Sequence, residues 1–203
     1  MNKTIPLKKI AKYSGSRISI KNVNTDNFIT TDNLLQNKLG ITKAISLPPQ
    51  DGNMTAYFNK NILIGNIRPY LKKIWFADRD GGNSADVLTL QVNDEHNPKF
   101  VYYALYRNDF FEHMMKGSKG TKMPRGDKTQ IMDFIIPNID KLSEDKIANI
   151  LSSLDSKIEL NNKINKELET MAKTLYDYWF VQFDFPDENG KPYKSSGGKM
   201  VYN

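Results

Sequence analysis

Apolar residues recur at heptad spacing through the C-terminal part of the chain, between Ser143 and Phe180. No Gly or Pro interrupts this stretch before Pro186, so the pattern predicts one continuous helix, roughly 55 Å long at ~1.5 Å per residue. Eight of the ten positions in two heptad series hold an apolar or aromatic side chain, as in the seam of a coiled coil. The series are Ile147, Leu154, Asn161, Leu168 and Leu175, and Ile150, Lys157, Ile164, Met171 and Tyr178.

The predicted helix has a start signal and a polar residue within its seam. Ser143 is the expected N-cap, and Glu144 and Asp145 follow in the first turn, where the helix dipole favours negative charge. Asn161 lies near the middle, where a polar seam residue commonly fixes register. Two interpretations are open. The helix packs on its own domain, or it pairs with another helix through Ile147, Ile150, Leu154, Ile158, Asn161, Ile164, Leu168, Met171 and Leu175.

The residues before this helix alternate between short β-prone runs and turn residues. Because Asn, Asp, Gly or Pro bound these runs, strands are predicted at 18–20, 28–30, 44–47, 61–64, 72–77, 85–92 and 131–136. The Asp-Gly-Gly sequence within residues 79–83 predicts a hairpin between the two strands that flank it. Asn97 as cap and Pro98 as first residue predict a helix that continues to about Tyr106, and a second short helix is expected at about 109–115.

These elements predict an α+β fold with three parts. Residues 1–140 are expected to form one mixed, mostly β domain, and residues 141–182 the long coiled-coil helix. Residues 183–203 are rich in Pro, Gly, Ser and charge, as in a linker or flexible tail.

Composition narrows the function classes. The 39% of hydrophobic residues indicates a folded protein, and the absence of cysteine excludes disulfides, Cys-zinc sites and thiol catalysis. The N-terminus lacks the apolar core of a signal peptide and no run of about 18 apolar residues occurs, so a cytoplasmic protein is expected. Residues 1–140 carry 20 Lys and Arg against 13 Asp and Glu, whereas residues 141–203 carry 9 against 10. A basic domain on a nearly neutral spacer suggests a polyanionic partner, most often nucleic acid.

The segment from His113 to Lys128 is the most informative candidate site. A basic residue occurs at every third position or so, with glycines between them, and Asp127 is its only acid within the loop. A glycine-rich backbone can approach phosphates closely while the cations neutralise them or reach base edges. A solvated basic loop is the alternative. The residues of this segment predicted to face DNA are Lys116, Gly117, Ser118, Lys119, Gly120, Thr121, Lys122 and Arg125.

A second candidate segment places cations beside aromatic residues, and the alternative for it is an ordinary surface strand. Its predicted DNA-facing residues are Asn66, Arg68, Lys72 and Lys73. Arg68 precedes Pro69 and is therefore expected to be extended, and an arginine in this setting suits a phosphate or guanine contact. Arg17 and Lys43 form a third set.

Enzyme signatures are missing from the sequence. Gly120-Thr-Lys-Met does not match the phosphate-binding loop of ATPases, and neither a nucleophile elbow nor a dinucleotide-binding glycine loop occurs. His96 and His113 have no partner at metal-ligand spacing, so no metal site is expected. A nuclease with an unrecognised site is retained only as a minor alternative.

Four stretches together resemble the specificity subunit of type I restriction–modification systems. They are NILIGNIRPY at 61–70, GSKGTKMPR at 117–125, the helical run at 147–164, and LYDYWFV at 175–181. The last two are the most specific, and the resemblance covers residues 1–182.

This resemblance implies a non-catalytic, DNA-binding protein. Members carry target-recognition domains, each followed by a long helix, with two such halves in tandem and the two helices antiparallel. Each domain reads one half of a split site on double-stranded DNA. The subunit holds the methyltransferase subunits, which use S-adenosylmethionine, and through them the ATP-driven restriction and translocase subunit. No cofactor is therefore expected on this chain.

The sequence departs from the full pattern because it holds one half only, either as a natural half-subunit or as a truncated one. An exposed apolar seam predicts a homodimer of antiparallel helices or pairing with a second half-subunit. The alternative is a self-standing dimeric DNA-binding regulator that needs no methyltransferase.

Overall fold

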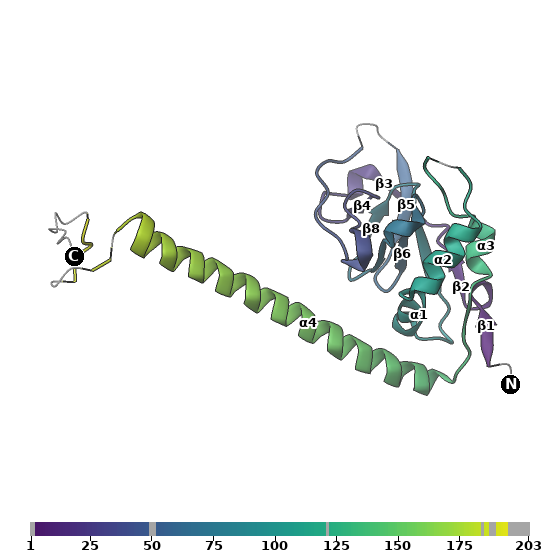
Figure 1. The fold of residues 1–203 in the computed structure, drawn as a ribbon. Helices are drawn as coiled ribbons and strands as arrows, with labels where there is room; N and C mark the ends of the chain where they lie inside the picture. Colours follow the sequence, from purple (N-terminus) through teal and green to yellow (C-terminus); the bar gives the residue numbers. More distant parts are fainter. Residues whose placement is uncertain (1–2, 49–51, 121, 184, 187–189, 195–203) are drawn as a thin grey trace. The chain divides into compact units, whose positions relative to one another are not determined.

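The computed structural model of the chain describes residues 3–48, 52–120, 122–183, 185–186 and 190–194. The chain divides into two compact units, Met1–Leu151 and Ser152–Asn203. The first unit is a mixed α/β assembly and the second is helical, so the predicted α+β class is confirmed (Figure 1). No helix among the described residues is long and apolar enough to cross a membrane.

Two four-stranded sheets and one strand pair build the first unit. The first sheet is antiparallel, in the order β2 (Ala11–Tyr13), β9 (Val87–Val92), β6 (Ile62–Gly65) and β7 (Ile74–Phe76). The second sheet has the order β3 (Arg17–Ser19), β5 (Asn53–Tyr57), β8 (Gly81–Asn83) and β4 (Phe28–Ile29), with β4 and β8 parallel. A separate antiparallel pair joins β1 (Thr4–Pro6) to β10 (Ile135–Pro137).

Strand β6 is buried on both faces and separates two cores. Ile62 and Ile64 belong to the larger core, which the helices cover, whereas Leu63 belongs to a core that contains Tyr57 and Ile29 from the second sheet. Side chains alternate between the two faces of a strand, so a continuous apolar run is the pattern that such a two-sided position requires. The prediction of a strand at 61–64 is confirmed with a shift of one residue.

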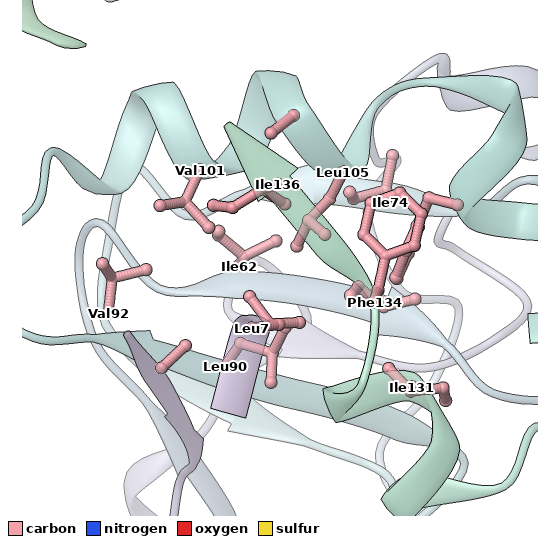
Figure 2. Packing of buried hydrophobic residues seen from close by; sticks show 14 of the residues in the cluster. Leu7, Ile62, Ile74, Leu90, Val92, Val101, Leu105, Ile131, Phe134 and Ile136 are labelled. Carbon is pink, nitrogen blue, oxygen red and sulfur yellow. The ribbon is translucent and has the colours of Figure 1, made fainter. Parts of the chain in front are cut away.

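Three short helices cover the larger core: α1 (Pro98–Leu105), α2 (Asn108–Lys116) and α3 (Lys128–Met132). Figure 2 shows Val101 and Leu105 of α1 near Ile62 of the first sheet and Ile136 of β10, with Leu90 beside Leu7 in the same core. Helix α1 begins as predicted at Pro98.

The side chain of Asn97 caps α1 and accepts hydrogen bonds from the backbone N–H groups of Lys99 and Phe100 at 2.8 and 3.1 Å. Single 3₁₀ turns connect other elements: η1 (Leu7–Lys9), η2 (Ile20–Asn22), η3 (Gln36–Lys38) and η4 (Pro69–Leu71).

The predicted hairpin across residues 79–83 is wrong. This segment is itself strand β8, and the strands on its two sides, β7 and β9, both pair with β6 instead of with each other. The glycines serve close packing there, because a Cβ on Gly81 would lie 2.1 Å from the carbonyl oxygen of Asn27 and 2.5 Å from the hydroxyl of Tyr57. The hydroxyl of Thr89 in β9 donates to the side chain of Asn83 in β8 at 2.8 Å, which links the two sheets.

Other local predictions also shift. Residues 44–47 form no strand, because Ala44 is buried while Ile45 is fully exposed and the backbone follows an irregular path. The strand predicted at 131–136 is divided between α3 and β10, since the side chain of Asp127 caps a helix that was not predicted. Strands β1 and β2 were not predicted either; each has only three residues.

The long helix α4 (Lys141–Tyr176) is present and ends in a π-helical turn, η5 (Asp177–Val181). Its start differs from the prediction, because Ser143 lies inside the helix. The carboxylate of Asp140 accepts bonds from the N–H and hydroxyl of Ser143 at 2.9 and 2.7 Å and thereby acts as the cap. These bonds lower the pKa of Asp140.

A buried carboxylate fixes the first turns of α4 to the rest of the first unit. Glu144 is fully buried and accepts hydrogen bonds from the backbone N–H of Asn97 at 2.6 Å and from Nδ1 of His96 at 2.7 Å. The neighbouring Asp145 accepts a bond from the Asn97 side chain at 2.6 Å. Ala148 is the other buried residue of α4.

Within the second unit, the apolar side chains of α4 are exposed to solvent. From Leu154 to Leu175 these side chains are 44–61% exposed, and Trp179 and Phe180 at the end of the helix are 46% and 65% exposed. The ring of Trp179 stacks on Phe185, which in turn stacks on Tyr193. This unit has an apolar surface without a hydrophobic core of its own among its described residues.

Replacing the buried carboxylate should destabilise the first unit. Glu144→Ala leaves the Asn97 N–H and the His96 ring without their acceptor, which is expected to cost about 3 kcal/mol of unfolding free energy. Urea unfolding followed by the fluorescence of the buried Trp75 measures this cost. Glu167→Ala, at an exposed position on the same helix, is the control and should cost under about 0.5 kcal/mol.

Candidate nucleic-acid interface

The glycine-rich basic segment forms a closed loop between α2 and α3. We call residues 117–127 the basic loop. Lys119 and Arg125 exchange two backbone hydrogen bonds, each 3.0 Å long, so the two sides of the loop pair like strands. Gly120 has φ of +94°, a conformation that a side chain would oppose. Gly120 is therefore suited to its position beside this backbone pairing.

The second predicted segment lies directly against this loop. We call residues 66–72 the Arg68 turn. The backbone N–H of Arg68 donates to the carbonyl of Pro124 at 2.7 Å, and the N–H of Gly126 donates to the carbonyl of Asn66 at 3.1 Å. The two segments, which are distant in the sequence, thus form one surface.

Arg68 has left-handed backbone angles, φ 51° and ψ 64°, and the predicted extended conformation is wrong. The proline that follows disfavours the right-handed helical region, and Arg68 takes the left-handed region instead of the expected extended one. The backbone stays there because Arg68 bonds to Pro124 on one side and accepts from the N–H of Leu71, at 2.9 Å, on the other. The Arg68 side chain is exposed.

Cations at the surface of the basic loop are only partly neutralised. The side chain of Lys119 is 86% exposed and its ammonium lies 3.5 Å from Asp127, while Arg125 is 59% exposed and pairs with Asp86 at 3.0 Å. Lys122 is exposed. Such exposed pairs contribute little to stability and can exchange for a phosphate.

The base of the basic loop is tightly packed. Asp127 accepts from the backbone N–H groups of Thr129 and Gln130, and these bonds, followed by the charge of Lys119, lower its pKa. Gly117 packs against the side chain of Gln130. A Cβ on Gly117 would lie 2.0 Å from the amide oxygen of Gln130, so this position has no room for a side chain. The loop is consequently anchored at both ends while its tip is exposed.

Two predicted residues lie inside the protein. Lys73 is 9% exposed and its ammonium donates to the carbonyl of Thr31, and burial lowers the pKa of this lysine. Asn66 is 7% exposed, and its side-chain oxygen has no hydrogen-bond partner among the described residues. Neither buried side chain is therefore placed to contact DNA.

The remaining predicted residues of these segments differ in role. The ammonium of half-buried Lys72 donates to the side-chain oxygen of Asn108 at 3.1 Å. Lys116, in the last turn of α2, is exposed, and the hydroxyl of Ser118 donates to the carbonyl of Met115 at 2.8 Å. Thr121 lies outside the described residues.

The third predicted set belongs to the second sheet and its adjoining loop. The guanidinium of Arg17 in β3 donates to the carbonyl of Asn53 at 2.8 Å. The ammonium of Lys43 pairs with Asp26 at 3.0 Å, and both partners are largely exposed. The polar partners described for these two residues lie outside the basic loop and the Arg68 turn.

Two residues of the surface escaped the sequence analysis. Asp86 pairs with Arg125, and Lys38 donates to Asn108 beside Lys72 at 3.0 Å. A lone aspartate after a strand and a lone lysine in an Asn-rich turn carry no signal in the sequence, since only the fold brings them to their partners.

All nine residues predicted for dimerisation are exposed on α4, including Asn161. They form the apolar stripe that the heptad pattern indicated, and no described residue covers it beyond the first turns of the helix. Elsewhere, no cluster of three or more His, Asp or Glu side chains that could hold a metal ion occurs in the described part of the chain.

Comparison with known proteins identifies the family. Residues 2–170 match the model of the type I restriction modification DNA specificity domain. The type I restriction enzyme HindI specificity subunit of Haemophilus influenzae is 32% identical over 166 residues, which are 77% of this chain and 36% of that protein. The MjaIX specificity subunit of Methanocaldococcus jannaschii is 29% identical over 105 residues, 52% of this chain and 22% of that protein.

Solved structures share the fold. The HsdS subunit from Thermoanaerobacter tengcongensis has a TM-score of 0.59 at 17% identity, over 93% of this chain and 50% of that one. The S subunit of a type I restriction-modification system from M. genitalium has a TM-score of 0.59 at 18% identity, over 89% and 45%. The chain spans about a third of the first curated relative and half of these structures. This chain belongs to the family of type I restriction modification DNA specificity domains.

Proposed function

We propose that this chain is a DNA-binding half-subunit that reads one half of a bipartite site on double-stranded DNA. The observation that carries this proposal is the union of the basic loop with the Arg68 turn, which places Arg68 on the same surface as Lys119, Lys122 and Arg125. Of these cations, some are expected to position phosphates and a minority to read base edges.

The rest of the assembly is proposed from the family. Residues 1–140 recognise DNA, and residues 141–182 act as spacer and dimerisation helix. The tail or linker predicted at 183–203 lies largely outside the described residues. The chain carries no catalysis. It docks a methyltransferase subunit, which binds S-adenosylmethionine, and through it a restriction and translocase subunit that uses ATP. This system operates in the cytoplasm.

The α4 stripe supports pairing with a second half. A helix that exposes an apolar seam over six turns or so gains stability when another helix covers it. We propose an antiparallel homodimer, or pairing with a separately encoded half-subunit. The two-fold axis of the homodimer crosses near Asn161 to Ile164, and two recognition domains then face a symmetric, interrupted site.

Co-expression with the cognate methyltransferase subunit tests the proposed function. We expect the two proteins to co-purify, and sequencing of modified bases in the genome should find a palindromic adenine motif with an internal gap. A non-palindromic gapped motif would mean pairing with a different second half. Absence of both a complex and a modified motif would favour a self-standing DNA-binding regulator.

Charge reversal tests the basic loop. In a variant with Lys119→Glu and Lys122→Glu, affinity for duplex DNA should fall by about tenfold or more. The slope of log affinity against log salt concentration should fall by about 1 for each phosphate contact that is lost. Fluorescence anisotropy at several salt concentrations measures both. Reversal of two other exposed lysines is the control: Lys3, next to β1, and Lys60, at the end of β6 opposite the Arg68 turn. Equal losses in both variants would contradict a specific role for the loop.

A single charge within the apolar stripe tests the helix pairing. Leu168→Glu buries a carboxylate in the proposed seam, so the dimer dissociation constant should rise by about 100-fold or more. Asn162→Glu adds the same charge on the outer face of α4 and should leave the constant within about twofold. Sedimentation equilibrium gives these values. A wild-type protein that stays monomeric at tens of micromolar would refute the homodimer.

A further inference from the structure

Two lysine ammonium groups converge on one neutral oxygen beside the Arg68 turn. Lys38, in η3, and Lys72, directly after η4, donate to the side-chain oxygen of Asn108 at 3.0 and 3.1 Å. Because both bonds end on the same atom, the two ammonium groups lie within about 6 Å of each other, where like charges repel. Both lysines are half-buried.

No carboxylate in the described part of the chain offsets the charge of this lysine pair. The nearest carboxylate along α2, on Asp109, is bound by the guanidinium of Arg107. Among the described residues, no carboxylate forms a salt bridge with either lysine. Burial, followed by the charge of Lys72, lowers the pKa of Lys38, as expected for a cation held near another cation. The site therefore has a deficit of negative charge that a bound anion would correct.

The backbone and an aromatic ring hold the two lysines in place. The N–H of Lys38 donates to the carbonyl of Lys72 at 2.9 Å, and both residues have positive φ, 64° and 51°. The hydroxyl of Tyr106 donates to the carbonyl of Lys38 at 3.2 Å, and the Lys38 ammonium lies 4.8 Å from the centre of the Tyr106 ring. Two cations positioned in this way lose less side-chain freedom when an anion binds.

The pair is continuous with the candidate interface. Arg68 and Lys72 flank the 3₁₀ turn η4 on its two sides. The backbone N–H of Arg68 donates to the carbonyl of Pro124 in the basic loop. Asn108 is the first residue of the nine-residue helix α2, where the helix dipole favours negative charge. The lysine pair is therefore joined to the basic loop through the Arg68 turn.

We propose that Lys38 and Lys72 form a phosphate-binding site for the sugar-phosphate backbone of DNA. The side-chain oxygen of Asn108 preorganises this site by accepting a hydrogen bond from each ammonium group. This inference rests on the proposed function and assigns different roles in DNA binding to the lysine pair and the basic loop. The lysine pair positions the duplex without regard to sequence, while exposed side chains of the basic loop reach the bases.

Neutral variants test the site through the salt dependence of binding. With a labelled duplex of random sequence, Lys38→Gln and Lys72→Gln should each lower the slope of log affinity against log salt concentration by about 1. The double variant should bind about tenfold more weakly at one fixed salt concentration. Lys60→Gln removes the same charge at the end of β6 opposite the Arg68 turn, and it should keep the wild-type slope.

Asn108→Asp separates a binding role from a structural one. A carboxylate at this position would pair with both ammonium groups, so the melting temperature should rise while affinity for the duplex falls by about tenfold. A higher melting temperature with unchanged DNA affinity and slope would overturn the inference, because the lysines would then be purely structural.

The remaining outcomes are distinguishable. If the wild-type protein does not bind duplex DNA at any salt concentration, the proposed function fails and the inference fails with it. If wild-type binding depends on salt and both lysine variants retain its slope, only the inference fails. Inorganic phosphate, compared with chloride at equal ionic strength, should not displace the duplex; displacement would indicate a site for free phosphate instead of the DNA backbone.

Discussion

The burial of β6 on both faces is the constraint on which the first unit depends. Ile62 and Ile64 fill the core beneath the helices, and Leu63 fills the core shared with the second sheet, so a shift of one residue would exchange the two faces. This register also fixes where the strand ends at Gly65. The Arg68 turn begins with the next residue, and its position is therefore set by the packing of the strand that precedes it.

Sequence predicted those elements whose signals are local. The Asn97 cap and Pro98 specified the start of α1, and heptad spacing specified α4, because in both cases the determining residues lie within a few turns of each other. Strand β8 could not be predicted in the same way. Gly81 is required there because the hydroxyl of Tyr57 and the carbonyl of Asn27 leave no room for a side chain. These contacts come from distant segments, and they make the Asp-Gly-Gly sequence part of a strand instead of the hairpin turn that it suggested.

The candidate interface was predictable in part for the same reason. Composition alone identified the basic loop and Arg68, but only the fold joins them and turns Lys73 inward to the carbonyl of Thr31. Lys38 was missed because its partners, Lys72 and Asn108, are far away in the chain. Residue type therefore indicated the chemistry of the surface, whereas strand packing and positive-φ turns decided which cations reach it.

The joint between the basic loop and the Arg68 turn is made by backbone atoms. Its hydrogen bonds, from Arg68 to Pro124 and from Gly126 to Asn66, do not depend on which side chains the loop exposes. Lys119 and its exposed neighbours can thus be replaced while the frame that presents them persists. If these side chains read DNA, the frame allows new target sequences to evolve by ordinary point mutation, with little accompanying risk to folding, and the same property makes the loop a suitable place to engineer a different specificity.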